Sequence, residues 1–400
     1  MSSKMNARPQ YIATTDARER AIITAQGLDP DRFRVKSMKS YVAANGEART
    51  SWQIELDKRI EADEKEALTV ANERRAAERE ALKQLNTDND IAMQFDQAVA
   101  ASTKIIRQYK PPVYRGLVGH DAMVINTADW QIGKNENGVG TDETIRRIID
   151  CIYQAERWIL FMRAMGNVMP KLVILSPGDL VEGCVGFYSN QTYTVDRDRR
   201  SQTVIVVQLL TKLLTVLGRH FDEIEVMAVG GNHGENRSGS GKLLTTRHDN
   251  DDCLVWDLVK HSFDGQGRTD ITWHIAGHEL SMAREIAGVH VGLTHGHLFK
   301  SGSSAAIKWL QGQQFGREET AGVDLLVTGH FHSLIVHEFS AGRFWIQNPT
   351  TDPGSAWFAE SSGISSTPGM LIFRLDCQNP SKFDDLKVLV PAQPVVEIAA

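Results

Sequence analysis

Acidic, amide and imidazole side chains recur in this chain directly after short apolar segments, usually beside a glycine. Five groups share this pattern: Asp129 and Gln131; Asp179; Asn232 and His233; His295; and His330 and His332. Carboxylate, amide and imidazole groups suit hard or borderline divalent metal ions. The absence of cysteine from these groups argues against a structural zinc site. The pattern therefore predicts a metal site that performs chemistry.

The five apolar segments are the elements that must position these side chains. They are rich in Val, Ile and Leu and end in turn-like sequences, as buried strands do. They cover residues 122–126, 172–176, 224–229, 289–294 and 325–328. Helices are expected between several of them, over residues 142–165 and 203–217. This alternation predicts an α/β fold, in which ligands bind at the carboxyl ends of the strands.

The first 115 residues have a different character. Residues 56–98 contain no Gly or Pro and are rich in Ala, Glu, Lys and Arg, which favours a helix. Lys110-Pro111-Pro112 then marks a boundary, because proline disfavours helix at itself and at the preceding residue. We expect a helical N-terminal segment of unassigned role over residues 1–115 and a catalytic domain over residues 116–400. A small basic cluster at residues 32–39 is interpreted as plain surface or as a phosphate contact.

Composition excludes several classes of protein. The chain has 400 residues and a net charge of −6, which excludes a strongly basic nucleic-acid coat. Residues 1–115 carry +3 and residues 116–400 carry −9. The four cysteines show no zinc-finger spacing. No apolar run of about 18 residues and no secretory signal are apparent, so the expected location is the cytoplasm of the producing or host cell.

The polar groups also match a known motif series. Asp129-Trp130-Gln131, Gly178-Asp179 with Glu182, Gly231-Asn232-His233, His295 and Gly329-His330-Phe331-His332 stand in the order of the motifs of the calcineurin-like metallophosphoesterase superfamily, which residues 118–350 therefore resemble. The nearest branch is the SbcD-like group of nucleases and phosphodiesterases, and the overall layout resembles phage-encoded proteins. The resemblance implies a four-layer α/β sandwich, here with a mainly helical N-terminal extension.

The resemblance also implies a role for each motif residue. Asp179 would bridge two metal ions. The first ion would be completed by Asp129, Gln131 and His332, and the second by Asn232, His295 and His330. Asp179 and Asn232 would thus belong to the catalytic centre together with His233, which would stabilise or protonate the leaving oxygen rather than bind metal. His297 and Arg237 are the candidates for binding the substrate.

The sequence departs from the family pattern at Gln131, where most members have histidine. The amide oxygen is either a metal ligand or only a hydrogen-bonding group. Carbonyl oxygen is a harder ligand than imidazole and suits Mn²⁺ or Mg²⁺ better. We expect two divalent ions, Mn²⁺ in the first place, with Mg²⁺, Zn²⁺ or Fe²⁺ as the alternatives. Glu182 stands where many members have aspartate and is expected to lie outside the direct ligand set.

The charge of such a centre suits phosphate. Two divalent ions and the carboxylates of Asp129 and Asp179 leave a net charge of about +2 facing the substrate. Ions about 3.5–4 Å apart can share a hydroxide and clamp the attacking and leaving oxygens of a displacement. An acidic domain can therefore still bind a phosphoester.

Three functions remain open from the sequence. The first is two-metal hydrolysis of DNA by a nuclease or exonuclease that uses a metal-bridging hydroxide. The second is a small-nucleotide phosphodiesterase, pyrophosphatase or phosphomonoesterase. The third is a scaffold that retains a metal site. Residues 1–110 are the candidate surface for a protein partner or self-association, and no membrane contact is expected.

Overall fold

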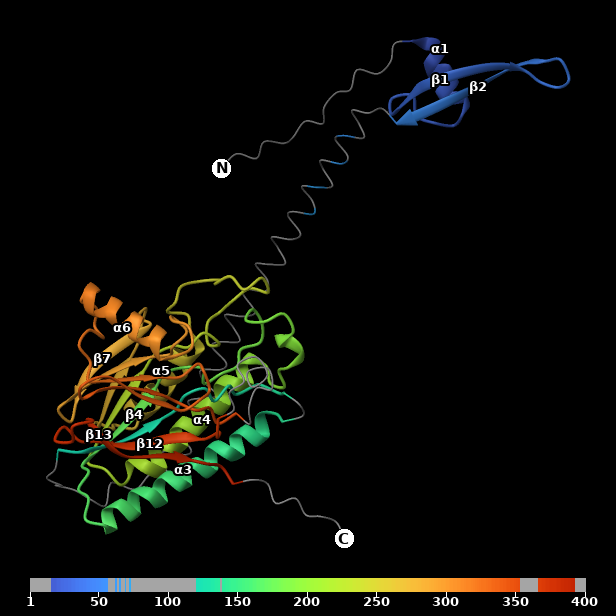
Figure 1. The fold of residues 1–400 in the computed structure, drawn as a ribbon. Helices are drawn as coiled ribbons and strands as arrows, with labels where there is room; N and C mark the ends of the chain where they lie inside the picture. Colours follow the sequence, from blue (N-terminus) through green and yellow to red (C-terminus); the bar gives the residue numbers. More distant parts are fainter. Residues whose placement is uncertain are drawn as a thin grey trace, which may run out of the picture. The chain divides into compact units, whose positions relative to one another are not determined.

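The structure is a computed structural model that describes residues 16–56, 62, 65, 69, 72, 120–136, 139–352 and 366–392. The chain divides into two compact units, residues 1–89 and 90–400 (Figure 1). The boundary expected near residues 110–116 lies outside the described residues, as does almost all of the helix expected over 56–98.

The described part of the first unit is a short helix and a hairpin. Helix α1 (Ala17–Ala25) begins after Asp16, whose side chain accepts a hydrogen bond from the Arg18 backbone N–H at 2.9 Å. Strands β1 (Phe33–Val42) and β2 (Ala48–Leu56) pair antiparallel. We did not expect this hairpin, although its turn contains Asn45-Gly46, a recognised hairpin signal, and Gly46 has a positive φ of 83°. The basic residues of the cluster lie on or beside β1.

The second unit contains a six-stranded sheet at its centre. Its strand order is β13-β12-β3-β4-β5-β6. Strands β3, β4, β5 and β6 run parallel to one another, whereas β12 pairs antiparallel with both β3 and β13. The strands are β3 (Ala122–Asn126), β4 (Lys171–Ser176), β5 (Glu223–Ala228), β6 (Ile271–Ile275), β12 (Met370–Leu375) and β13 (Phe383–Leu389). Strand β12 thus returns to pair with β3, and β13 adds to β12 at the edge of the sheet.

A five-stranded sheet faces the first one. Its order is β10-β11-β9-β8-β7, and its central strands β8, β9 and β11 run parallel. The strands are β7 (Ser281–Ile286), β8 (Val289–Thr294), β9 (Leu325–Thr328), β10 (Ile335–Ser340) and β11 (Arg343–Gln347). Each of the five strands expected from the sequence is present, with ends that differ by at most one residue.

Helices cover the outer faces of the two sheets. They are α3 (Thr141–Ala164), α4 (Arg199–Gly218), α5 (Asp251–Asp264) and α6 (Ser303–Gly316), besides a short 3-10 turn, η1 (Gln191–Tyr193). Helices α3, α4 and α5 pack on the six-stranded sheet, and α6 packs on the other sheet. The two helices expected from the sequence are α3 and α4.

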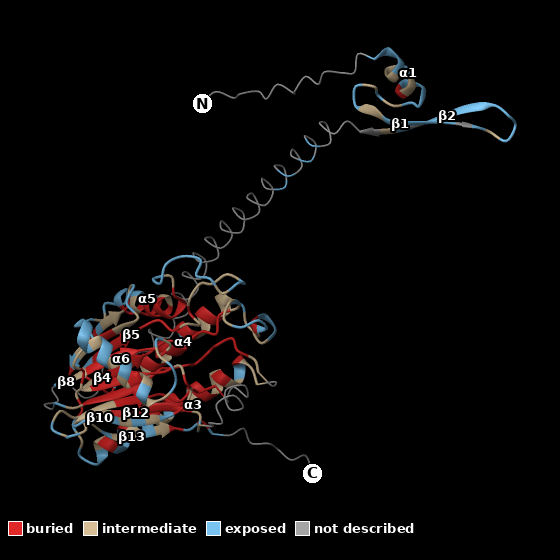
Figure 2. Cartoon of the chain, turned by 45° about the horizontal axis from the view of Figure 1, so that its top comes forward, coloured by how far each residue is buried: buried red, intermediate tan, exposed pale blue. Residues whose placement is uncertain are grey.

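Three separate apolar cores define the layers. One lies between α3–α5 and the six-stranded sheet, a second lies between the two sheets, and a third lies under α6. Figure 2 shows the buried residues concentrated in the strands and in the helix sides that face them. The order helix, sheet, sheet, helix confirms the expected four-layer α/β sandwich.

Helix α4 differs from the other described helices in its composition. It is 20 residues long with a mean hydropathy of 1.5 over its most apolar window, so by length and composition it could cross a membrane. We expected no such segment. However, 61% of that window is buried inside the unit. Its apolar character is that of a core helix packed between α3, α5 and the sheet.

Candidate metal centre

The five groups of polar side chains meet at one edge of the sandwich. Asp129 and Gln131 follow β3, Asp179 follows β4, and Asn232 and His233 follow β5. His295 follows β8 of the facing sheet, and His330 and His332 follow β9. Because β3, β4 and β5 are parallel neighbours, their carboxyl ends lie side by side. In the five-stranded sheet, β8 and β9 also pair in parallel, so their carboxyl ends lie side by side as well.

The backbone at these strand ends adopts a rare conformation. Nine non-glycine residues in the described part have positive φ. Five of them are expected metal ligands: Asp129 (51°), Gln131 (44°), Asp179 (54°), His330 (73°) and His332 (55°). Such conformations cost about 1–3 kcal/mol each and persist where the surroundings enforce them, often at functional sites. Here these positive φ values turn the backbone sharply just after strands β3, β4 and β9.

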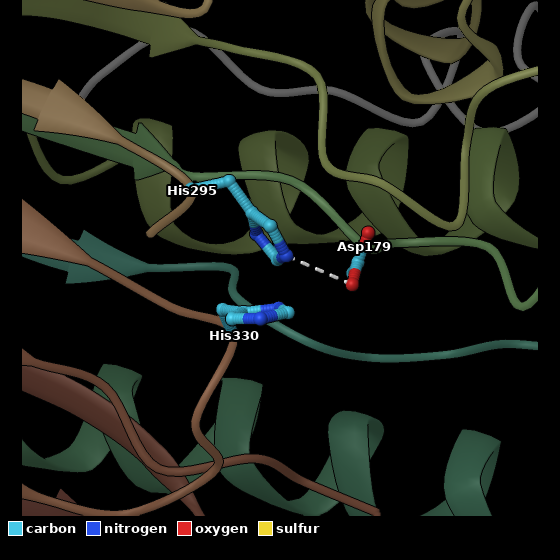
Figure 3. Close-up of side chains that lie close together, drawn as sticks. All are labelled: Asp179, His295 and His330. Atoms are coloured by element: carbon cyan, nitrogen blue, oxygen red, sulfur yellow. Dashed lines mark ion pairs between the residues drawn. The ribbon is translucent and has the colours of Figure 1, made fainter. Parts of the chain in front are cut away.

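Asp179, His295 and His330 form the tightest cluster of potential ligands (Figure 3). One ligand atom from each side chain lies within 4.8 Å of the others. The Nε2 atom of His295 is 2.9 Å from an Asp179 carboxylate oxygen. All three side chains point toward a common space between the β4, β8 and β9 ends. A divalent cation is the group that such a mixed oxygen and nitrogen donor set accepts.

Asn232 joins this cluster through its amide oxygen. That oxygen lies 3.1 Å from Nε2 of His295. The other ring nitrogen of His295, Nδ1, lies 2.9 Å from the backbone oxygen of Pro177. A backbone acceptor at Nδ1 fixes the proton there and directs Nε2 into the site, an arrangement typical of metal-binding histidine.

Asp129, Gln131 and His332 form the other half of the expected centre. Nε2 of His332 is 3.5 Å from an Asp129 carboxylate oxygen, and both oxygens of Asp129 accept the backbone N–H of His330 at 3.0 Å. The amide oxygen of Gln131 accepts a hydrogen bond from Lys134 at 3.3 Å. This oxygen keeps a second lone pair, so both roles expected for Gln131, metal ligand or hydrogen-bonding group, stay open.

Lys134 is a buried cation beside this half of the centre. Its ammonium also contacts Asp352 at 2.6 Å and Glu136 at 3.3 Å. Burial alone would lower the pKa of Lys134, but the Asp352 carboxylate outweighs it, so the pKa is raised and the ammonium stays charged. The sequence analysis did not single out Lys134, because its partner Asp352 lies 218 residues away.

The electrostatics of the centre favour added positive charge. Asp129 and Asp179 are 0% and 1% exposed, and buried carboxylates require compensating charge. Burial would lower the pKa of His295, but the adjacent Asp179 raises it to about 9. Burial together with neighbouring His295 lowers the pKa of His330, which keeps that imidazole neutral and able to bind metal. The donor set therefore fits a divalent cation.

His233 lies beside the cluster and is held by Glu182. Its backbone N–H donates to Asp179 at 2.8 Å. Its Nδ1 lies 3.0 Å from the backbone oxygen of Glu182 and 3.2 Å from the Glu182 carboxylate. Burial would lower the pKa of His233, but Glu182 and Asp179 raise it to about 10. The hydroxyl of Tyr188 donates to the same carboxylate at 2.6 Å.

Asp252 is a site residue that the sequence analysis missed. It lies fully buried in the first turn of α5 and accepts the backbone N–H groups of Asp179 (2.9 Å), Leu180 (2.8 Å) and Gly231 (2.8 Å). It therefore ties the loop after β4 to the loop after β5. Asn250-Asp251-Asp252 reads as a helix start, but no local signal reveals these distant partners.

Two glycines allow the site loops to approach the carboxylates. A Cβ atom at Gly231 would lie 2.1 Å from an Asp179 carboxylate oxygen, and one at Gly329 would lie 2.5 Å from an Asp129 oxygen. Real Cβ contacts are essentially never under 3.0 Å, so a side chain at either position would displace the carboxylate. This explains in physical terms why glycine precedes Asn232 and His330.

The two expected substrate residues lie in different surroundings. The ring of His297 is 5.4 Å from His295 and 6.2 Å from His330, so it borders the cluster. Arg237 forms an ion pair with Glu235 and donates to the backbone oxygen of Gly241 at 3.3 Å. Its guanidinium also lies 4.8 Å from the centre of the Phe187 ring. Arg237 is thus engaged with protein groups.

Comparisons with known proteins give likeness in fold alone. No protein-family model and no curated protein matches the chain. Zinc-complexed Vps29 from Entamoeba histolytica is 13% identical, with 63% of this chain and 84% of that chain covered and a TM-score of 0.27. Phosphopantetheinyl hydrolase from Mycobacterium tuberculosis is 10% identical (62% and 95% covered, TM-score 0.28). A purple acid phosphatase from yellow lupin is 11% identical (65% and 50% covered, TM-score 0.29).

Proposed function

We propose that this chain is a metal-dependent phosphoesterase that hydrolyses nucleotide phosphodiester bonds. The observation that carries the proposal is the convergence of Asp179, His295 and His330 within 4.8 Å at the carboxyl ends of strands from two sheets. His233 lies next to this cluster with its own carboxylate partner. Bound divalent cations and an adjacent proton donor are the two groups that metal-dependent phosphoester hydrolysis uses.

Two sets of residues would hold the cations. Asp179, Asn232, His295 and His330 form one set, and Asp129, Gln131 and His332 form the other, with Asp179 between them. Divalent cations bound there would neutralise charge on the phosphoryl group and supply an activated water. Mn²⁺ is the cation that we propose, since four of the seven ligands offer oxygen atoms.

His233 is proposed to deliver a proton to the leaving oxygen. Its Nδ1 faces two acceptors on Glu182, so Nε2 is the nitrogen left to meet a substrate. The Glu182 carboxylate stabilises the charged imidazolium and fixes the ring orientation. Phe187 stacks on the ring, with centroids 4.7 Å apart and planes at 11°, and shields that face from water.

The charge distribution favours short nucleotides or strand ends over the interior of long duplex DNA. Affinity for long nucleic acid comes chiefly from contacts between cationic residues and phosphates. Residues 116–400 carry a net charge of −9 and cannot provide a broad cationic track. A DNA nuclease therefore requires added contacts, and exposed Lys39 and Arg49 on the β1–β2 hairpin support that version.

A substrate panel with metal removal tests the proposal. The full chain is incubated with Mn²⁺ and with labelled single-stranded DNA, double-stranded DNA, dinucleotides, cyclic nucleotides and a bis-aryl phosphate. We expect hydrolysis that stops on chelation and returns when Mn²⁺ is restored. If none of these substrates is hydrolysed in a metal-dependent way, the proposal is contradicted and a scaffold role is favoured. Cleavage of dinucleotides without cleavage of DNA would exclude the nuclease version.

A further inference from the structure

A cavity of about 440 Å³ lies beside His233, outside the metal centre. Two loops line it, residues 185–192 and residues 237–241. The lining side chains and glycines are Val185, Gly186, Phe187, Tyr188, Ser189, Gln191, Thr192, Arg237, Gly239, Ser240 and Gly241. Its volume is within the usual range of small-molecule sites, roughly 300–1,000 Å³.

The cavity wall is shared with the proposed proton donor. Phe187 stacks on His233 with one face, and the Arg237 guanidinium lies 4.8 Å from the centre of the same ring. Gln191, which is 1% exposed, accepts the Phe187 N–H at 3.2 Å and donates to the backbone oxygen of Glu182 at 2.9 Å. The loop that forms the cavity is therefore fastened to the residue that orients His233.

The lining chemistry suits an uncharged planar group with polar edges. Among the described residues that line the cavity none is acidic, and the charge of Arg237 is paired with Glu235. Tyr188 is 38% exposed and offers an aromatic surface. Ser189, Thr192 and Ser240 add hydroxyl groups, and three glycines leave backbone groups accessible. Aromatic surface with hydrogen-bonding groups at its edge is how proteins hold single nucleobases.

We propose that this cavity binds the nucleobase of the leaving nucleotide. The inference rests on the proposed phosphodiesterase function, because the position next to His233 places the cavity on the leaving-group side. Stacking of one base contributes about 1–3 kcal/mol, and about 1.4 kcal/mol is a factor of ten. The cavity would therefore make a base-bearing leaving group a better substrate by roughly tenfold or more.

A cavity-filling substitution at Gly239 provides a specific variant. A Cβ atom there would meet only the Val185 side chain, at 3.8 Å, which is an ordinary contact, and the backbone φ of Gly239 is not positive. Gly239→Leu should therefore fold and fill the cavity. Gly312, on the exposed side of α6, has nothing within 4 Å of such a Cβ atom, so Gly312→Leu is the matched control. Ser240→Trp is a second filling variant on the same wall.

The test compares a dinucleotide with a version whose leaving nucleoside lacks its base. Wild-type protein and Gly312→Leu should show kcat/KM at least about tenfold higher for the intact dinucleotide. Gly239→Leu and Ser240→Trp should remove that preference and leave hydrolysis of the base-free version within about twofold. Equal rates for the two substrates with wild-type protein, or equal losses on both with the filling variants, would overturn the proposal.

Binding of a nucleoside gives a readout that does not depend on turnover. Adenosine and thymidine are titrated into each protein by calorimetry. Binding should be present in wild type and Gly312→Leu and absent in Gly239→Leu, and no binding to wild type would overturn the cavity assignment. The two proposals can fail separately. If the dinucleotides and the bis-aryl phosphate are not hydrolysed, the proposed phosphodiesterase function is wrong. If a nucleoside still binds to wild type and not to Gly239→Leu, the cavity is nevertheless a nucleobase site.

Discussion

The two halves of the candidate centre are built differently. Around Asp179, three ligand side chains converge within 4.8 Å, and His295 is oriented by a backbone acceptor. In the other half, Nε2 of His332 lies 3.5 Å from an Asp129 carboxylate oxygen, and the Gln131 oxygen already accepts a hydrogen bond from Lys134. The Asp179 half thus offers two imidazoles, a carboxylate and the Asn232 amide, while the Asp129 half offers one imidazole, a carboxylate, an amide and a nearby ammonium.

This difference predicts that the two proposed cation positions have unequal affinity. A buried ammonium opposes a divalent cation at short range, although Asp352 and Glu136 offset much of its charge. We therefore expect the Asp179 half to bind its cation more tightly.

Asp179→Asn should have the largest effect, because Asp179 is the carboxylate that we propose to hold both cations. Loss of its charge removes compensation for both cations, and metal ions contribute several kcal/mol to transition-state stabilisation. We expect kcat to fall at least about 1,000-fold, with far-UV circular dichroism unchanged. Retention of more than a tenth of the activity would show that Asp179 does not hold the cations.

His295→Ala and His332→Ala should separate the two halves. In calorimetric titrations with Mn²⁺, His295→Ala should weaken the tighter binding event by more than about 100-fold, since even the loss of groups that only support a ligand costs about 10–100-fold. His332→Ala should leave that event within a few-fold and weaken only the second one. If the two variants gave the same titration, the inequality between the halves would be wrong.

The loops that support the halves should differ in their contribution to stability. Asp252→Asn removes an anionic acceptor shared by four N–H groups on the Asp179 side, where hydrogen bonds to charged groups contribute about 1.5–3 kcal/mol each. Thr350→Val removes two bonds of the Thr350 hydroxyl, which donates to the Asp129 backbone oxygen at 2.6 Å and accepts the Asp352 backbone N–H at 2.9 Å. In urea denaturation, we expect the free energy of unfolding to fall by at least about 2 kcal/mol for Asp252→Asn and by about 1–2 kcal/mol for Thr350→Val.

The same pair of variants has a pH signature in metal-free protein. Burial and the charge of Asp179 raise the pKa of Asp252 to about 6 from an ordinary value of 3.8. Between these two values the folded chain binds a proton that the unfolded chain lacks. The free energy of unfolding contributed by this group therefore falls as pH rises through that window. Asp252→Asn should flatten this dependence, whereas Thr350→Val should leave it unchanged.

Gln131→His should have the smallest effect and should narrow the difference between the halves. Imidazole in place of the amide gives the Asp129 half a second nitrogen ligand, which favours Zn²⁺ over Mn²⁺. We expect the weaker Zn²⁺ binding event to tighten by about tenfold, with the tighter event unchanged. If both Zn²⁺ binding events of the variant have the same affinity as in wild type, residue 131 is not a ligand.

The parts of this molecule that could be predicted from sequence are those with local signals. Apolar runs over residues 122–126 and 325–328 correspond to strands β3 and β9 without any shift. Glycine beside an acid or histidine marked the strand ends. The β1–β2 hairpin was missed, because Lys, Arg and Ser interrupt its apolar residues, although Asn45-Gly46 was a usable turn signal.

The remaining parts depend on contacts between residues far apart in the chain. Lys134 meets Asp352 across 218 positions, and Asp252 meets Asp179 across 73. Such pairs leave no periodicity or composition bias, so neither residue could be identified as part of the site. The same holds for the cavity beside His233, whose two loops are about 50 residues apart and become one wall only when β4 and β5 pair.

The strands, their alternation with helices and the types of side chain at the strand ends follow from the amino-acid sequence alone, because each is encoded within a few neighbouring residues. Only the folded chain shows which of these side chains face each other, that Glu182 holds His233, and that Lys134 donates a hydrogen bond to the amide oxygen of Gln131. The reason is physical: strand pairing and sheet packing set the distances between ligands, and those distances, with burial, decide charge and proton position at the site.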